Sequence, residues 1–354
     1  MPNDLSHGLP VDGLAEPAEG APPVVLPLDF SGAQLVAADA EPPLAQDRPI
    51  SGAGDEAAAI TGLLVAHSFG DAGVLLPTMA SVRRAMLDTI RAHHRIAGRP
   101  KRRHLLVCAP PGTVLPPELA GDAEVSLVAD DMGAVRAEIG PRTAGLLVSP
   151  VRLAAGLEML SGSLLADLRE SADEYGLILA FDETDGGLGR TGMAFAHEWT
   201  GVTPDLMLLG EGAGLPLAAL VMTQKVARGL PASLPRPEAA AVAQAAHVVQ
   251  MALAAGFEAR IQALGWMLED RLATLRWRRP DLFTGLAGTG LMQGLVCPGA
   301  AEELAARLAQ AGLFVRAIGC VLAFLPPLTV TEGEIAAAAE HLEHAVAQME
   351  PVPA

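Results

Sequence analysis

Lysine is nearly absent from this chain: among its 354 residues only Lys101 and Lys225 are lysines. The 41 aspartates and glutamates outnumber the 24 lysines and arginines, which gives a formal net charge of −17. Nucleic acids and anionic membrane surfaces are bound through clustered lysine and arginine side chains. The sequence therefore excludes both as expected partners.

Cysteine is also scarce, and Cys108, Cys297 and Cys320 are widely spaced without a Cys-x-x-Cys pair. This spacing argues against a disulfide framework and indicates free thiols in a reducing compartment, so we expect a cytoplasmic protein. No metal site is expected. The segment from Met1 to Ala21 is acidic and rich in proline and glycine, so we expect no secretory signal.

Aromatic residues make up only 3% of the chain, although 51% of it is hydrophobic, so the core is expected to consist of small aliphatic side chains. The longest uncharged run, Ala239 to Phe257, contains Gln244, His247 and Gln250. We interpret it as a buried, alanine-rich helix rather than a membrane span.

The chain is long enough for two domains with filled cores. Residues 1–50 show no sustained hydrophobic period and are expected to form a poorly ordered arm. Residues 51–235 alternate short apolar strands with helices, which predicts an α/β domain with a mainly parallel sheet and helices on both faces. We assign residues 236–258 to a connecting helix and residues 259–354 to a small α+β C-terminal domain.

The local patterns place the expected elements as follows. Helices are expected at Ser81 to Ala97, Leu160 to Tyr175, Ile261 to Trp277, Glu302 to Ala311 and Glu332 to Gln348, the last with Thr331 as its N-cap. Strands are expected at His104 to Cys108, Ala144 to Val148, Leu177 to Phe181, Leu206 to Leu209, Leu217 to Met222, Gly290 to Cys297, Phe314 to Arg316 and Cys320 to Leu325.

Five short segments, in this order and spacing, resemble the class III aminotransferases of the ornithine and 4-aminobutyrate type, which depend on pyridoxal phosphate (PLP). They are DETDGGLGRTG from Asp182, GVTPD from Gly201, LPLAA from Leu215, GTGLMQG from Gly288 and LPPLTVTE from Leu325. The resemblance covers most of the chain from about Ser81 onward and implies the type I PLP-transferase fold. The family's functional residues must then be sought position by position.

The resemblance places the partner of the cofactor's pyridine ring at Asp182, directly after the strand Leu177 to Phe181. There its carboxylate would keep the ring nitrogen protonated. The alternative is a structural carboxylate, bonded to backbone amides or to a cation such as Arg190 or His197.

The family's tethering lysine has no counterpart at its expected place. Alignment from the Leu-Pro step at Leu215 puts Leu209 at that position, and a short deletion puts Glu211 there instead. Neither side chain can form a Schiff base. Lys225 and Lys101 lie in segments that are typical of solvent-exposed surface.

The phosphate and substrate contacts implied by the resemblance are also altered. Thr78 keeps a hydroxyl in the phosphate cradle, but Met79 replaces a glycine there. Ser233, in the loop that reaches the partner subunit, is either a substitute phosphate contact or an ordinary loop serine. Ala287 and Ala323 occupy positions of arginines, and a methyl group cannot replace a bidentate guanidinium.

We therefore expect a non-catalytic homologue without a bound cofactor, acting as a partner or stabilising subunit of an active aminotransferase in a homodimer or heterodimer. The alternative is an active PLP enzyme that moves an amino group between an amine or amino acid and a 2-oxo acid, using Lys225 or Lys101. A third interpretation is noncovalent pyridoxamine phosphate with Glu211 as the base. The fourth is an unrelated ligand in the vacated cleft.

Overall fold

The computed structural model describes residues 28–31, 53–210 and 215–349. Within these residues the large domain is built on a seven-stranded sheet in the order β2-β10-β9-β8-β5-β3-β4. Neighbouring strands from β9 to β4 are parallel, whereas β10 is antiparallel to both of its neighbours. The expected mainly parallel sheet is confirmed, with these strands: β2 (Ala72–Leu76), β3 (His104–Cys108), β4 (Val125–Val128), β5 (Thr143–Val148), β8 (Ile178–Asp182), β9 (Leu206–Leu209) and β10 (Ala218–Met222).

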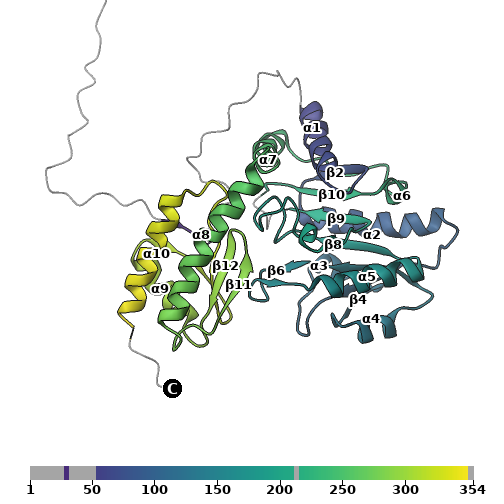
Figure 1. Ribbon diagram of the computed structural model, residues 1–354. Helices are drawn as coiled ribbons and strands as arrows, with labels where there is room; N and C mark the ends of the chain where they lie inside the picture. The colour runs from purple at the N-terminus through teal and green to yellow at the C-terminus, as the bar shows by residue number, and fades with distance from the viewer. Residues whose placement is uncertain (1–27, 32–52, 211–214, 350–354) are drawn as a thin grey trace, which may run out of the picture.

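Helices cover both faces of this sheet (Figure 1). Helix α2 (Met79–Ile96) packs Val82, Met86 and Ile90 on one face, and α4 (Met132–Glu138) and α5 (Gly162–Tyr175) cover the other. α1 (Ala53–Ala66) and α7 (Ala239–Ala252) pack against each other beside β2. Short helices of this domain are α3 (Pro117–Ala120), the 3-10 helix η1 (Ala196–Thr200) and α6 (Gln224–Ala227).

The small domain is a four-stranded antiparallel sheet, β11 (Gly285–Thr289), β12 (Met292–Val296), β15 (Val321–Phe324) and β14 (Arg316–Ile318), in that spatial order. One face packs against α8 (Phe257–Arg278), α9 (Ala301–Gln310) and α10 (Glu332–Ala347), with α8 and α10 side by side (Figure 1). The other face meets the β6–β7 hairpin, Val151–Arg152 and Glu158–Met159, of the large domain. Thr331 caps α10 as expected, and Glu334 completes a capping box.

Part of the predicted N-terminal arm has a defined structure. Leu28–Asp29 form β1, which pairs in parallel with β13 (Leu313–Phe314) of the small domain. The Phe30 side chain is only 1% exposed and belongs to the core shared with that domain. The expectation of disorder is therefore wrong for these residues, while the rest of 1–50 lies outside the described residues.

The expected connecting helix, residues 236–258, is shorter in the structure. α7 ends at Ala252 and α8 begins at Phe257, with a bend of 75° between them. Val242, Ala245 and Val249 are buried in the hydrophobic core of this chain. Packing within the chain therefore explains the apolar composition of α7, which is no evidence for a subunit interface.

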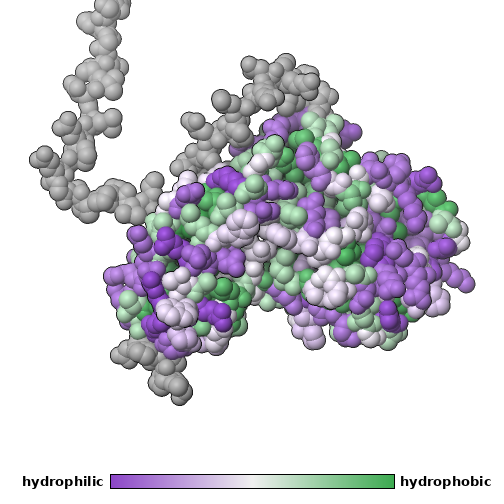
Figure 2. All heavy atoms as spheres, viewed as in Figure 1, coloured by the Kyte–Doolittle hydropathy of each residue, from purple (hydrophilic) through white to green (hydrophobic). Residues whose placement is uncertain are grey.

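Among the described residues no single helix is long and apolar enough to cross a membrane; α7 and α8 pass that test only as a bent pair, on length and composition. Hydrophilic and hydrophobic residues are interspersed over both domains on the face seen in Figure 2.

A buried histidine in α2 predicts loss of stability in acid. His94 is 1% exposed, its Nε2–H donates to the carbonyl of Ala144 at 2.7 Å, and its buried Nδ1 has no partner among the described residues. Burial is the main cause that lowers the pKa of His94 from 6.5 to about 4. The unfolded chain therefore takes up this proton first, so stability is complete above the unfolded pKa and is lost as the pH falls from 6.5 towards about 4.

The expected loss from His94 is about 2 kcal/mol between pH ~7.5 and pH ~5. Urea unfolding at these two pH values measures it. The His94→Gln variant keeps an amide donor for Ala144 but does not titrate, so its unfolding free energy should change less by about that amount. An equal pH dependence in both proteins would contradict the assignment.

Candidate functional site

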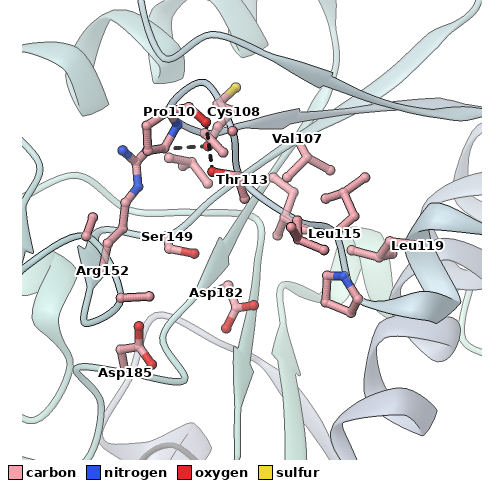
Figure 3. A pocket seen from close by; sticks show the side chains of 18 of the residues that line it. Val107, Cys108, Pro110, Thr113, Leu115, Leu119, Ser149, Arg152, Asp182 and Asp185 are labelled. Atoms are coloured by element: carbon pink, nitrogen blue, oxygen red, sulfur yellow. Dashed lines mark hydrogen bonds between the residues drawn. The ribbon is translucent and has the colours of Figure 1, made fainter. Parts of the chain in front are cut away.

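A cavity of the described structure opens at the carboxyl ends of β3, β5 and β8. Its volume is about 660 Å³, and the loop Ala109–Pro116 forms one wall. Figure 3 shows Arg152 and Asp185 on one side, Leu115 and Leu119 on the other, and Asp182 between them. Ligands of open α/β sheets bind at this edge, so it is the candidate site.

Asp182 is the last residue of β8, and it lines this cavity. It pairs in register with Leu208, whose side chain lies in the core on the α2 face. Its Oδ1 accepts the amide of Thr184 at 3.1 Å and also the Thr184 hydroxyl. The turn after β8 therefore orients the carboxylate, and no cation among the described residues forms a salt bridge with it.

The two cations considered as partners of Asp182 are used elsewhere. The guanidinium of Arg190 is buried and donates to the carbonyl of Pro326 at 2.8 Å. His197 Nδ1 lies 2.9 Å from a carboxylate oxygen of Glu183. Of the alternatives for a structural Asp182, only the backbone-amide one agrees with the structure.

Asp185 adds a second carboxylate to the cavity. Burial, together with the charge of Asp182, raises the pKa of Asp185, although the Leu153 amide that donates to it at 2.8 Å opposes this. The two guanidinium groups in the cavity wall are already neutralised: Arg83 pairs with Glu118 at 2.7 Å and Arg152 with Asp130 at 2.5 Å. The open space is thus most polar around Asp182 and Asp185.

Both lysines lie near the end of the sheet at which the parallel strands begin, whereas Asp182 lies at the end at which they finish. β10 runs antiparallel, so its Ala219 end lies beside Leu209 at the cavity edge, and Met222, which leads to Lys225, lies at the far edge. Lys101 precedes β3 and is at that same far edge. A five-residue strand spans roughly 16 Å, too far for a lysine side chain to cross. Neither amine reaches the cavity.

Of the two residues proposed for the lysine position, the structure describes Leu209 but not Glu211. Leu209 is buried in the core shared with α7 and α8, on the face of the sheet opposite to Asp182, and its side chain packs near Gly187. It does not line the cavity. Glu211 lies outside the described residues. The preceding Gly210 faces Met79, whose sulfur occupies the place where a side chain at Gly210 would project.

The expected phosphate contacts, Thr78 and Ser233, do not line the cavity. Thr78 is exposed at the N-terminus of α2 and forms a capping box with Ser81, its Oγ1 accepting the Ser81 amide at 3.2 Å. Ser233 is exposed in the loop that follows α6, and it is not part of the cavity lining. Among the described residues, no group of three or more His, Cys, Asp or Glu side chains could hold a metal ion.

Comparison with known proteins identifies the family. The family model described as Aminotransferase class-III matches residues 103–346. Acetylornithine aminotransferase 1 of Bradyrhizobium diazoefficiens is 34% identical over 303 residues, which are 79% of this chain and 75% of that protein. The chain belongs to the class III aminotransferases.

Other relatives of this class III aminotransferase agree. Acetylornithine aminotransferase of Rhodobacter capsulatus is 33% identical over 323 residues, 83% of this chain and 81% of that protein. The crystal structure of N-acetylornithine aminotransferase from Stenotrophomonas maltophilia matches with a TM-score of 0.71 and 25% identity, covering 84% of this chain and 80% of that one. The expected type I fold is confirmed.

Family membership corrects the expectation that no cofactor is bound. The class III aminotransferases depend on PLP, so PLP, and not the absence of a cofactor, is what the comparisons support. The residues present fit such a group as a noncovalent ligand. The cavity of about 660 Å³ has room for it, and Asp182 stands in the wall where a ring nitrogen needs an acceptor. What the chain lacks at this edge is an amine to tether it.

Sequence reasoning missed three arginines: Arg83 and Arg152, which line the cavity, and Arg316, whose charge acts on Asp185. Arg316, on β14, lies outside the five family-like segments, and no motif singles it out. Its place became visible only from the pairing of β14 with β15, a contact that local patterns do not encode.

Proposed function

We propose that this class III aminotransferase homologue does not complete amino transfer alone and that it acts as the partner subunit of an active family member. The observation that carries the proposal is the position of Lys101 and Lys225 at the far edge of the sheet. Amino transfer needs a primary amine at the reacting carbon, both as the anchor and as the proton carrier. The chain has no third lysine to supply it.

The retained residues suggest what the subunit still does. When bound, PLP draws electrons away from the amine-bearing carbon of a substrate. Asp182 would hold a proton at the ring nitrogen, and Thr184 keeps that carboxylate oriented. We further propose Thr78 and Ser233 as phosphate contacts; Ser233 is exposed, so it is available to a neighbouring subunit. A homodimer or heterodimer therefore remains part of the proposal.

The test uses the purified chain with PLP, alone and after co-expression with a complete class III aminotransferase from the same genome. The relatives named above are acetylornithine aminotransferases, so an enzyme of that kind is the first partner to try. Native mass spectrometry should show the two chains together. Alone, the chain should transfer amino groups at least ~10²–10⁴-fold more slowly than the partner, the factor that a positioned base contributes.

Borohydride reduction followed by peptide mapping provides the decisive control. We expect no cofactor fixed to either lysine, and we expect Lys225→Ala to leave the amount of bound cofactor unchanged. A stoichiometric adduct on one lysine, accompanied by amino transfer from the chain alone, would establish the active-enzyme alternative and reject the proposal.

A further inference from the structure

Two of the three cysteines lie opposite each other at one end of the small-domain sheet. Val296 of β12 is paired with Val321 of β15, so the next opposed positions along the two chains are Cys297 and Cys320. The amide of Cys297 donates to the carbonyl of Cys320 at 2.7 Å. Opposed residues joined by such a bond have Cα atoms about 5.5 Å apart, which is within the range that a disulfide spans.

The two thiols are directed to the same face of the sheet. Cys297 is 0% exposed and packs with Leu322 in the core covered by α8, α9 and α10, whereas Val321 packs on the opposite face. Side chains alternate along a strand, so Cys320, which precedes Val321, is placed on the face of Cys297. Burial raises the pKa of Cys297 to about 11, and the charge of Cys320 adds to this increase.

The local backbone leaves Cys320 room to move towards Cys297. Ile318 pairs with Val321, so Gly319 and Cys320 form a two-residue turn between β14 and β15, and Cys320 is exposed there. The Cβ atoms of opposed residues are about 4.5–5.5 Å apart, and a disulfide needs about 3.5–4.5 Å. A shift of the turn by about 1 Å would bring the sulfurs into bonding range. An oxidant in solution would reach Cys320 first.

The third cysteine is placed differently. Cys108 lies on β3 in the core beneath α4 and α5, and it is 2% exposed. Burial raises its pKa to about 12, which keeps it a thiol and not a thiolate. Cys108 belongs to the large-domain sheet and Cys297 and Cys320 to the small domain, so it is an internal reference in a thiol count.

The Cys297–Cys320 position lies next to the contact between the two domains. Val321 packs with Val151 and Leu157 of the β6–β7 hairpin of the large domain. Leu153, in the same hairpin, donates its amide to Asp185 of the candidate site. A covalent link at Cys320 would therefore hold the strand that contacts the segment supporting Asp185.

We propose that Cys297 and Cys320 form a reversible disulfide that stabilises the small domain when the chain meets a low-molecular-weight disulfide of the glutathione type. The Cys320 thiolate attacks one sulfur of oxidised glutathione and releases one glutathione thiolate. Cys297 then loses its proton and attacks the Cys320 sulfur, which releases the second glutathione. The two protein thiols are oxidised, the glutathione disulfide takes up their two electrons, and the two protons end on the two glutathione thiols.

This modification site lies outside the proposed function and needs neither a cofactor nor a partner subunit. The purified full chain is equilibrated with mixtures of reduced and oxidised glutathione, and its free thiols are alkylated for mass spectrometry. In oxidising mixtures the free thiols should fall from three to one, that of Cys108. Peptide mapping should find Cys297 linked to Cys320, and dithiothreitol should restore all three thiols. The linked form should have a Tm higher by about 3–6 °C, because the link closes a loop.

Two variants separate the two steps. Cys320→Ser removes the accessible thiol, so the same mixtures should leave its Tm unchanged and its other two thiols free. Cys297→Ala removes the buried thiol, so Cys320 should keep one bound glutathione as a mixed disulfide. Three free thiols in the wild-type chain in every mixture would refute the proposal. So would glutathione retained on wild-type Cys320, a link to Cys108 or to a second molecule, or an unchanged Tm after complete linkage.

Discussion

Replacing Glu183 with alanine should lower the free energy of unfolding by about 3–5 kcal/mol. Glu183 is 1% exposed, and its carboxylate accepts three N–H donors. The amide and Nδ1 of His197 donate to Oε1 at 2.8 and 2.9 Å, and the amide of Ala196 donates to Oε2 at 2.9 Å. Alanine would leave all three donors buried without an acceptor, and each one costs about 1–3 kcal/mol.

Two further variants separate this network from a general loss of charge. Glu183→Gln keeps the shape but turns one acceptor into a donor that faces an N–H group, so its loss should be smaller, about 2 kcal/mol. Glu174→Gln changes an exposed residue of α5 and should be nearly neutral. Urea unfolding followed by circular dichroism measures all three. A Glu183→Ala loss no larger than that of Glu174→Gln would show that the three contacts do not hold the turn after β8.

The second large effect is expected at Arg152. Its side chain is 8% exposed; Nη1 contacts Asp130 at 2.5 Å and Glu158 at 3.1 Å, and Nη2 donates to the carbonyl of Cys108 at 3.4 Å. Arg152→Ala would leave the Asp130 carboxylate, 21% exposed, without its cation, which should cost about 3–5 kcal/mol. The same change would remove one of the side chains that line the cavity.

Arg307→Ala is the control for Arg152. It breaks an exposed pair with Glu303 on one helix and should cost about 0.5 kcal/mol. Arg152→Lys should lie between the two, because an ammonium cannot bond Asp130 and the Cys108 carbonyl with one planar fork. Equal stability of the Arg152→Ala and Arg307→Ala proteins in urea unfolding would show that the Asp130 pair is not a structural link.

Much of the local structure follows from sequence patterns. The strand His104–Cys108 and the strand Leu206–Leu209 have the predicted bounds, because each is a short apolar run that is buried on both faces. The Thr331 cap of α10 follows from its own side chain and from Glu334. The alanine-rich run from Ala239 was less predictable, since apolar composition alone does not mark the break before Phe257.

The candidate site was predictable in part. Asp182 follows a recognisable strand and lines the cavity, while its role as the partner of the pyridine ring stays a prediction. Leu209 was a poor candidate for the lysine position, because its place in the β9 pleat turns it towards the other face of the sheet. A shift of one residue along a strand moves a side chain to the other face of the sheet. An alignment across a short deletion does not determine which of the two neighbouring residues faces the cavity.

By itself the sequence determined the family segments, the mainly parallel sheet and the scarcity of lysine, because these depend on residue identity and on short-range periodicity. Only the tertiary structure decided that Lys225 lies at the edge away from Asp182 and that Arg316 faces Ala323. Both depend on the direction and register of strand pairs that are distant in sequence. Those pairings are selected by the packing of the whole core and not by the strands themselves.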